Sequence, residues 1–308
     1  MLNMTKAVLC GIIALLMTSL RTRCPAQTIA VKSGDSIAFM GDSITEQAWD
    51  SANGHWGWNS PVGHIHLVMN ALEANGIMAT AIPGGRSGHT SRDMLKRLQT
   101  DVLDKKPTWL ILSCGVNDVG PWNAGGKDAV LLSEYKSNIT AIVERSQAAG
   151  VNVMVSTITP IYEDQPTNDA NRLCVDYNNF LRALAREKKC LLVDLSADML
   201  ARRAELGNKG NIVTSDGVHL NTEGSFVWAT GILRTFGFSS DQILRARGAW
   251  MDIPNAVKLP GQLQSVSMRE LAQLQKLADQ KKSRLDVLIS EAFAGAISNL
   301  LKTAESGK

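Results

Sequence analysis

Three residues of this 308-residue chain could together carry nucleophilic chemistry. Ser43 lies in a Gly-Asp-Ser-Ile run directly after an apolar stretch, where a serine side chain can act as a nucleophile. Such a serine needs a general base, and His219 follows Asp216 by three residues. A tight turn at Gly217 would bring the Asp216 carboxylate to Nδ1 of the imidazole, which fixes the tautomer of a catalytic histidine. The alternatives are a purely structural Gly-Asp-Ser turn and a histidine that caps the next helix.

A serine nucleophile also requires donors for the oxyanion that forms during attack, and two segments could supply them. The first is Gly-Gly-Arg-Ser-Gly-His-Thr at 84–90, whose glycines allow backbone N–H groups to approach a ligand. Gly85 and Gly88 are both candidates for this N–H donor. The second is Gly-Val-Asn-Asp at 115–118, where the Asn117 side-chain amide can donate. Each segment taken alone could equally be an ordinary turn.

Alternating short apolar runs and longer amphipathic runs predict the elements that position these residues. Strands are expected at 35–40, 76–82, 108–114, 151–157 and 190–195. Helices are expected at 61–74, 91–103, 128–149, 169–188 and 222–236. Strands that are separated by helices pair in parallel, and both faces of the resulting sheet are covered. The candidate residues all follow predicted strands, and ligands bind at the carboxyl ends of parallel strands.

Four blocks in this order resemble the SGNH hydrolases, also called the GDSL family of esterases and lipases. The Gly-Asp-Ser block at 41–43 and the Gly-Val-Asn-Asp block at 115–118 match closely, and Asp-Gly-Val-His-Leu-Asn at 216–221 is typical. The block around Gly88 departs from the pattern, because the family often has Asn five residues before this glycine and Pro83 stands there. The resemblance covers roughly residues 33–238.

The resemblance implies an α/β fold: a three-layer α/β/α sandwich with a five-stranded parallel, flavodoxin-like sheet. It also implies ester hydrolysis without a metal or another cofactor. By this analogy Ser43 attacks, His219 is the general base and then the general acid, and Asp216 orients His219. The oxyanion would be held by the N–H groups of Ser43 and Gly88 and by the Asn117 side chain. The Gly-x-Ser-x-Gly elbow of the α/β-hydrolase fold is absent from the sequence around Ser43, which argues against that fold.

The first 26 residues have the features of a secretory signal peptide. Lys6 precedes a 14-residue apolar-rich run at 7–20, which is short for a membrane span, and Cys-Pro-Ala at 24–26 offers a cleavage site after Ala26. An uncleaved anchor is the alternative, and Arg-Thr-Arg at 21–23 disfavours a lipoprotein. The sequence therefore predicts a secreted or periplasmic protein with a hydrolase domain over 27–238.

The pattern changes at about residue 239, where a C-terminal helical extension over 239–308 is expected. A Pro- and Gly-bearing stretch at 251–262 precedes a capping box that Ser267 and Glu270 form. Leucines and alanines then recur at three- and four-residue steps up to Leu300, interrupted by a polar gap at 281–284. This predicts a packing element, with a helix break at the gap.

Charge and cysteine content exclude other classes of function. The formal net charge is +3, but removal of 1–26 takes away three of 32 basic residues and no acidic one, which leaves 29 of each. No basic field then indicates a nucleic-acid partner. Three of the five cysteines remain, none in CxxC spacing: Cys114, Cys174 and Cys190. His64 and His66 diverge on a helix, so no metal site is expected.

The loops around the predicted site favour a short acyl group on a carbohydrate. They are polar, with Trp56 and Trp58 placed to stack on a sugar ring, and Arg86 and His89 next to the oxyanion segment. A long acyl chain would need a continuous apolar channel, because each buried CH₂ contributes about 0.8 kcal/mol. The leading hypothesis is a secreted acetylesterase that acts on a small-molecule or glycan ester. A lysophospholipase or thioesterase, and a non-catalytic glycan-binding protein, are the alternatives, and the oligomeric state is open.

Overall fold

The computed structural model describes residues 28–50, 63–120, 130–259 and 262–306. The predicted signal peptide, Trp56 and Trp58 lie outside the described residues. Within them, no helix is both long enough and apolar enough to cross a bilayer.

The centre of the molecule is a five-stranded, all-parallel sheet with strand order β2-β1-β3-β4-β5. The strands are β1 (Ser36–Gly41), β2 (Thr80–Gly85), β3 (Trp109–Leu112), β4 (Asn152–Ser156) and β5 (Leu191–Val193). The five predicted strands and their parallel pairing are confirmed.

The second strand lies further along the chain than the predicted 76–82. In the register of β1 with β2, Ser36 faces Thr80 and Gly41 faces Gly85, so the strand includes the glycine pair. Gly76, at φ 76°, instead belongs to the turn after the preceding helix. A Cβ atom on Gly85 would lie 2.0 Å from the Glu46 backbone nitrogen, so the absence of a side chain permits helix α2 (Ser43–Asp50) to cross this strand.

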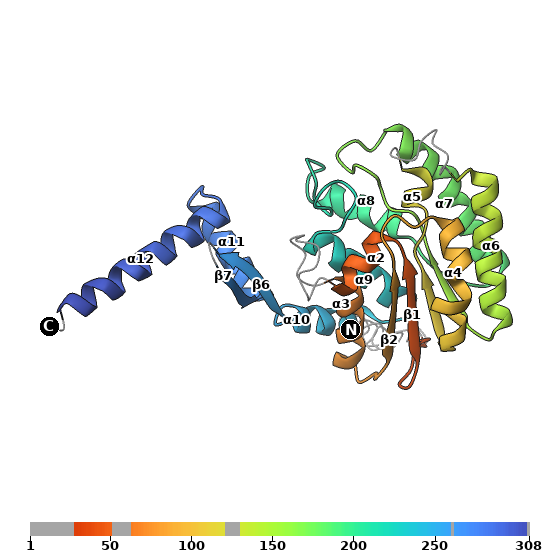
Figure 1. Ribbon diagram of the computed structural model, residues 1–308, viewed down its shortest axis with the longest axis horizontal. Helices are drawn as coiled ribbons and strands as arrows, with labels where there is room; N and C mark the ends of the chain where they lie inside the picture. Colours follow the sequence, from red (N-terminus) through yellow and green to blue (C-terminus); the bar gives the residue numbers. More distant parts are fainter. Residues whose placement is uncertain (1–27, 51–62, 121–129, 260–261, 307–308) are drawn as a thin grey trace, which may run out of the picture.

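Helices cover both faces of the sheet, as predicted. Figure 1 shows α4 (Ser91–Asp101), α6 (Leu132–Ala148) and α7 (Asp169–Glu187) on one side. The other side carries α2, α3 (His64–Ala74) and α9 (Thr222–Thr235), with α8 (Leu195–Glu205) packed beside α9. The architecture is therefore the expected three-layer α/β/α sandwich.

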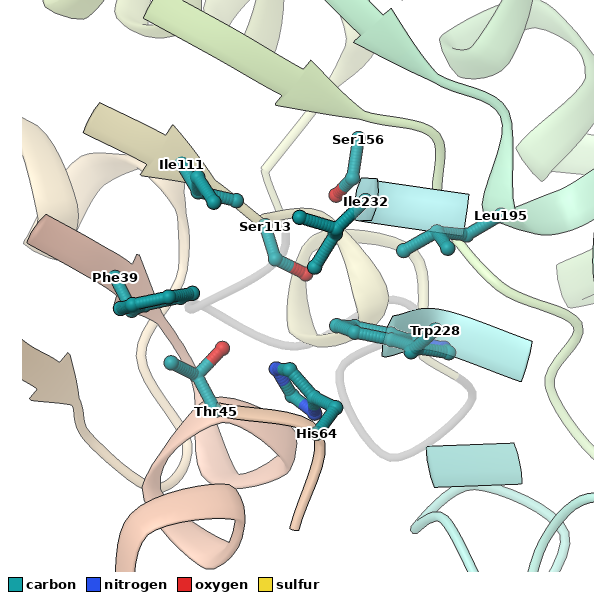
Figure 2. Close-up of a pocket in the computed structure, with 9 residues that line it drawn as sticks. All are labelled: Phe39, Thr45, His64, Ile111, Ser113, Ser156, Leu195, Trp228 and Ile232. Carbon is teal, nitrogen blue, oxygen red and sulfur yellow. The ribbon is translucent and has the colours of Figure 1, made fainter. Parts of the chain in front are cut away.

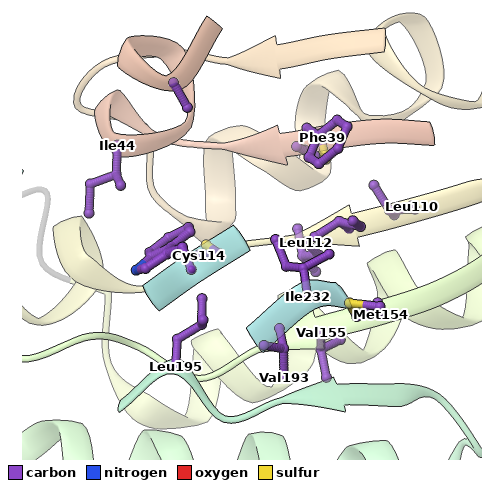
Figure 3. Packing of buried hydrophobic residues seen from close by; sticks show 14 of the residues in the cluster. Phe39, Ile44, Leu110, Leu112, Cys114, Met154, Val155, Val193, Leu195 and Ile232 are labelled. Carbon is purple, nitrogen blue, oxygen red and sulfur yellow. The ribbon is translucent and has the colours of Figure 1, made fainter. Parts of the chain in front are cut away.

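The core lies between these layers, and the central strands are apolar at consecutive positions because both of their faces are covered. All four residues of β3 are buried. Figure 3 shows Leu110 and Leu112 of β3, Met154 and Val155 of β4, and Ile232 of α9 among the buried residues on the two faces of the sheet. This packing fixes the carboxyl ends of the strands, from which the functional loops emerge.

The C-terminal part differs from the expected all-helical extension. Helix α10 (Ser240–Trp250) packs on α3, and the fully buried Trp250 donates through Nε1 to the Leu67 carbonyl oxygen at 2.9 Å. Strands β6 (Pro254–Leu259) and β7 (Gln262–Ser267) then pair as an antiparallel hairpin. The stretch that contains Pro260 and Gly261 thus connects two strands instead of leading directly into a helix.

The two helices after the hairpin agree with the sequence pattern. Helix α11 (Met268–Gln280) begins at the predicted capping box, in which Ser267 and Glu270 bond reciprocally. The polar gap at 281–284 separates α11 from α12 (Leu285–Ser306). In Figure 1 the hairpin and these helices extend away from the α/β body as an arm.

Candidate active site

Ser43 is the first residue of α2, immediately beyond the carboxyl end of β1. Asp42 accepts a hydrogen bond from the Ile44 backbone N–H at 3.0 Å, which shapes the turn into the helix. A Cβ atom on Gly41 would lie 1.9 Å from Thr45 Oγ1, so the turn requires glycine before Asp42. The local sequence thus places the Ser43 side chain at the edge of the sheet where parallel-sheet proteins bind ligands.

His219 lies within hydrogen-bonding distance of both other candidate residues. Its Nε2 is 2.9 Å from Ser43 Oγ, and its Nδ1 is 2.8 Å from Asp216 Oδ2. The other carboxylate oxygen of Asp216 accepts from the backbone N–H groups of Val218 and His219, at 2.9 and 2.7 Å. The three side chains therefore form a continuous serine–histidine–carboxylate chain of hydrogen-bonding contacts, the arrangement that a serine nucleophile requires.

The hydrogen bonds on Asp216 keep its carboxyl group ionised. Partial burial acts to raise the pKa of Asp216, but the bonds from the His219 backbone and side chain outweigh it, and the pKa is lowered. An ionised carboxylate beside Nδ1 orients the imidazole and stabilises the imidazolium that forms when Nε2 takes a proton.

The predicted oxyanion segments lie after β2 and β3. Asn117 is in the single-turn helix α5 (Val116–Val119), and its Nδ2 donates to the His89 carbonyl oxygen at 3.0 Å. This bond ties Asn117 to the 86–90 loop. Gly88 is exposed in that loop at φ 77°, a conformation that favours glycine. Gly85 lies within β2, under α2.

Several residues that the sequence analysis did not single out hold this loop. Glu46 Oε2 accepts from the Ser87 backbone N–H at 2.8 Å and from the Ser87 hydroxyl. Arg97 donates from Nη2 to the Gly41 carbonyl and from Nη1 to the Gly84 carbonyl, both at 2.8 Å. A single buried guanidinium thus joins the ends of β1 and β2. No fixed sequence spacing indicates these contacts.

Arg86 and His89, predicted to contact substrate, have protein partners in the structure. Arg86 forms an ion pair with Asp101 at 2.9 Å, while its side chain is 55% exposed. His89 Nδ1 accepts from Arg97 Nε at 3.1 Å. Burial and then the neighbouring Arg97 charge lower the pKa of His89, so this imidazole favours its neutral form.

Two buried carboxyl groups lie next to candidate residues in the chain: Asp42 precedes Ser43, and Asp118 follows Asn117. Burial raises the pKa of both Asp42 and Asp118 to about 6. Asp118 accepts from the Ser91 backbone N–H at 3.1 Å and from the Ser91 hydroxyl at 2.5 Å, which fixes the start of α4. From inside the molecule, Asp42 thus supports the turn at Ser43, and Asp118 supports the segment that carries Asn117 and the start of α4.

A small cavity lies deeper in the core, below the carboxyl ends of β1, β3 and β4 (Figure 2). It is lined by Phe39, Thr45, His64, Ile111, Ser113, Ser156, Leu195, Trp228 and Ile232. Among the described residues, Thr45 Oγ1 and His64 Nδ1 have no hydrogen-bond partner. Burial, and to a lesser extent His66, lowers the pKa of His64 to about 3, so this histidine is neutral in the folded protein.

The described part of the chain holds no group of three or more His, Cys, Asp or Glu side chains that could bind a metal ion. His64 packs on Trp228, whereas His66 stacks on Trp49, so the two histidines face different neighbours. Cys114, Cys174 and Cys190 are free thiols.

The sequence of this chain matches the model of the GDSL-like Lipase/Acylhydrolase family over residues 39–225. The chain belongs to this family. The match spans β1 to α9 and includes Ser43, Asn117, Asp216 and His219. The chain is accordingly a carboxylic ester hydrolase, and the resemblance noted from the sequence blocks is confirmed.

Individual relatives are esterases of similar size to the hydrolase body. An acetylxylan esterase of Geobacillus stearothermophilus is 28% identical over 218 residues, which is 68% of this chain and 96% of that esterase. Its crystal structure matches with a TM-score of 0.59 at 25% identity, over 68% of this chain and 97% of that one. Esterase TesA of Pseudomonas aeruginosa is 23% identical over 70% of this chain and 90% of its own length.

Proposed function

We propose that this family member is an exported serine esterase that removes short acyl groups, chiefly acetyl, from carbohydrates through an acyl-enzyme on Ser43. The observation that supports it most directly is the chain of contacts from Ser43 Oγ through His219 to Asp216, at 2.9 and 2.8 Å. The similarity to an acetylxylan esterase supports the choice of substrate class.

In the first half-reaction, Ser43 Oγ attacks the ester carbonyl carbon while His219 Nε2 takes the hydroxyl proton. Asp216 stabilises the resulting imidazolium. The N–H groups of Ser43 and Gly88 and the Asn117 amide donate to the oxyanion of the tetrahedral intermediate. The intermediate collapses when the carbon–oxygen bond to the alcohol breaks, and His219 gives its proton to the departing sugar oxygen. An acetyl group then remains on Ser43.

In the second half-reaction, a water molecule attacks the acetyl-enzyme. His219 takes a proton from this water, and the oxyanion donors act again. The second intermediate releases acetate as the bond to Ser43 Oγ breaks, and His219 returns the proton to the serine. Neither step needs an oxidant or a reductant, since the ester and water become an acid and an alcohol without a change of oxidation state.

The surroundings of Ser43 support a polar substrate more than an alkyl chain. Arg86, Ser87 and Gly88, which follow β2, are exposed, and Glu46 beside them is partly exposed. We assign Arg86 and His89, together with Trp56 and Trp58, to contacts with the sugar. Arg86 retains enough exposure for this beside its ion pair, and His89 would act through its neutral ring.

The substrate class is tested with the purified protein on p-nitrophenyl esters of two to twelve carbons and on acetylated xylo-oligosaccharides. We expect kcat/KM to be highest for acetate and to fall steeply from about six carbons, with acetate released from the oligosaccharide. Faster cleavage of esters of eight or more carbons would favour a lipid acyl hydrolase. Absence of turnover on every ester would contradict the proposal and favour a glycan-binding role.

The matched control for this experiment is Ser43→Ala. We expect it to lower kcat by about 10⁴-fold or more, because the proposed acyl-enzyme cannot form without the Ser43 hydroxyl. Its circular dichroism spectrum should equal that of the unmodified protein. A variant that keeps a tenth of the activity would show that another residue attacks the ester.

Export is tested on protein recovered from the periplasm or medium of an expressing bacterium. Mass spectrometry should find a chain that begins at Gln27, because the predicted cleavage follows Ala26. A chain that keeps residues 1–26 would contradict cleavage.

A further inference from the structure

Glu163, in the loop between β4 and α7, is a fully buried carboxylate that faces the segment before Asp216. Its Oε1 accepts three hydrogen bonds: from the backbone N–H groups of Val213 and Thr214, at 3.0 and 2.7 Å, and from the Thr214 hydroxyl at 2.6 Å. Burial of an ion is costly unless it is paired and hydrogen-bonded, so this donor set gives Glu163 a defined place.

The Thr214 hydroxyl connects Glu163 to the turn at 216–219, which carries Asp216 and His219. A hydroxyl has one proton, and the Thr214 hydroxyl donates it to Glu163. Its oxygen is then directed to accept, and it accepts from the Gly217 N–H at 3.1 Å. Gly217 joins Asp216 to Val218, so one side-chain relay links the buried carboxylate to the residue next to Asp216.

The chain beside Glu163 holds the same turn from a second direction. The Tyr162 N–H donates to the Gly217 carbonyl oxygen at 2.7 Å. A Cβ atom on Gly217 would lie 2.8 Å from the Tyr162 ring, so the two segments are in close contact. The loop after β4 therefore holds the Gly217 carbonyl directly, and it holds the Gly217 N–H through the Thr214 hydroxyl.

Arg203 of α8 balances the charge of Glu163. Its Nε lies 3.5 Å from Glu163 Oε2, and both side chains are buried. Arg203 also donates from Nη2 to the Asn208 carbonyl oxygen at 3.0 Å. Arg203 thus ties the segment before Thr214 to α8. This contact limits the movement of the chain that leads into the turn at Asp216.

We propose that Glu163 is a positioning residue that sets the place of Asp216 and His219 through the Thr214 hydroxyl. This rests on the proposed roles of Asp216 and His219 in ester hydrolysis. Glu163 touches neither residue, so it acts on the reaction through the geometry of the turn, and the carboxylate–Thr214–Gly217 relay is the path.

The experiment compares Thr214→Val with Thr214→Ser in the full chain. Valine keeps the shape of threonine but removes the relay hydroxyl, whereas serine keeps that hydroxyl. We expect Thr214→Val to lower kcat for p-nitrophenyl acetate by about 10- to 100-fold, because small misplacements of reacting groups have effects of that size. KM should change less than twofold, and Thr214→Ser should stay within about threefold of the unmodified protein.

Glu163→Gln tests the carboxylate, with Glu205→Gln as its control. Glu205 forms an exposed ion pair with Arg202 on α8 and is not part of the Glu163–Thr214–Gly217 relay. The Glu205→Gln substitution should therefore leave kcat unchanged. Glu163→Gln places an amide where three donors converge, so we expect a fall in kcat like that of Thr214→Val. If this variant does not fold, the threonine pair still decides the proposal.

A readout independent of turnover separates this proposal from the proposed function. In ¹⁵N-histidine-labelled protein, the Nδ1 proton that His219 shares with Asp216 should give a low-field NMR signal, assigned by its loss in His219→Gln. Thr214→Val should shift or broaden that signal, whereas Thr214→Ser should leave it as in the unmodified protein. An unchanged signal with kcat within twofold, even at a lower melting temperature, would overturn the positioning role. An inactive wild type would contradict the esterase proposal, while the signal would still test the relay.

Discussion

Arg97 Nη2 donates to the Gly41 carbonyl oxygen at 2.8 Å, two residues before the nucleophile candidate Ser43. The same guanidinium binds the Gly84 carbonyl oxygen and pairs with Asp101 at 2.9 Å. The ends of β1 and β2 are therefore held by a residue of α4, the helix that follows the loop with Gly88. The turn at Ser43 depends on a residue that the sequence blocks of the family do not include.

Replacement of Arg97 by Met should destabilise the protein strongly. The side chain is only 8% exposed, and its loss removes a donor from each of the Gly41 and Gly84 carbonyl oxygens and one of the two arginines that pair with Asp101. We expect the free energy of unfolding to fall by about 3–5 kcal/mol, measured by urea denaturation. Arg145→Met on the exposed part of α6 is the control, and an equal small effect for both variants would contradict this role of Arg97.

Asn117→Ala should lower kcat by about 10²- to 10³-fold and change KM little. An oxyanion donor strengthens its bond only as the charge develops, and one such donor contributes on the order of 3 kcal/mol. Steady-state kinetics on p-nitrophenyl acetate measure both constants. A changed KM with an unchanged kcat would show that Asn117 binds the ground-state ester instead.

The C-terminal arm should be dispensable for chemistry, whereas α10 should not be dispensable for stability. A chain that ends at Ile253 keeps the buried Trp250 and its bond to Leu67, so its kcat should remain within about twofold. A chain that ends at Phe238 loses α10 and exposes α3. We expect its stability to fall by about 3–5 kcal/mol or more.

Urea denaturation and activity assays of the two truncated chains check this prediction. A well-folded but inactive chain ending at Ile253 would place the arm in the active site. A chain ending at Phe238 with full stability would show that α10 contributes little to the fold.

His64 should make the fold sensitive to acid. Burial lowers its pKa from 6.5 to about 3, so the unfolded chain binds a proton below pH 6.5 while the folded chain does not. The stability contributed by the neutral form is present above pH 6.5 and is lost as the pH falls toward 3. The expected loss between pH 7 and pH 5 is about 2 kcal/mol, because one pKa unit corresponds to about 1.4 kcal/mol.

The comparison with His64→Phe isolates this effect, because Asp42 and Asp118 titrate in both proteins. Their raised pKa values, about 6, act in the opposite sense, since their stabilisation is lost as the pH rises through 6. Between pH 7 and pH 5, the urea midpoint should fall further in the unmodified protein than in His64→Phe. Equal losses in the two proteins would show that His64 is not the acid-sensitive group.

The sequence alone determined the features that depend on local spacing. The contact of Asp216 with His219 follows from their three-residue separation across Gly217, and the capping box at Ser267 and Glu270 follows in the same way. The parallel sheet was predictable because buried strands alternate with amphipathic helices, and motifs after such strands meet at one edge.

Only the tertiary structure decided the contacts that join distant segments. Ser43 and His219 are 176 positions apart, and their 2.9 Å contact depends on the packing of α2 and α9 on the sheet. The hairpin β6–β7 was missed because only the Pro–Gly pair at 260–261 signals it. Arg97 pairs with Asp101 at the i,i+4 spacing of α4, but its two carbonyl partners come from other elements at no fixed spacing, as do the partners of Glu163. A buried charge must be paired, but the sequence does not say by which residue, because only the packed fold brings its partners within reach.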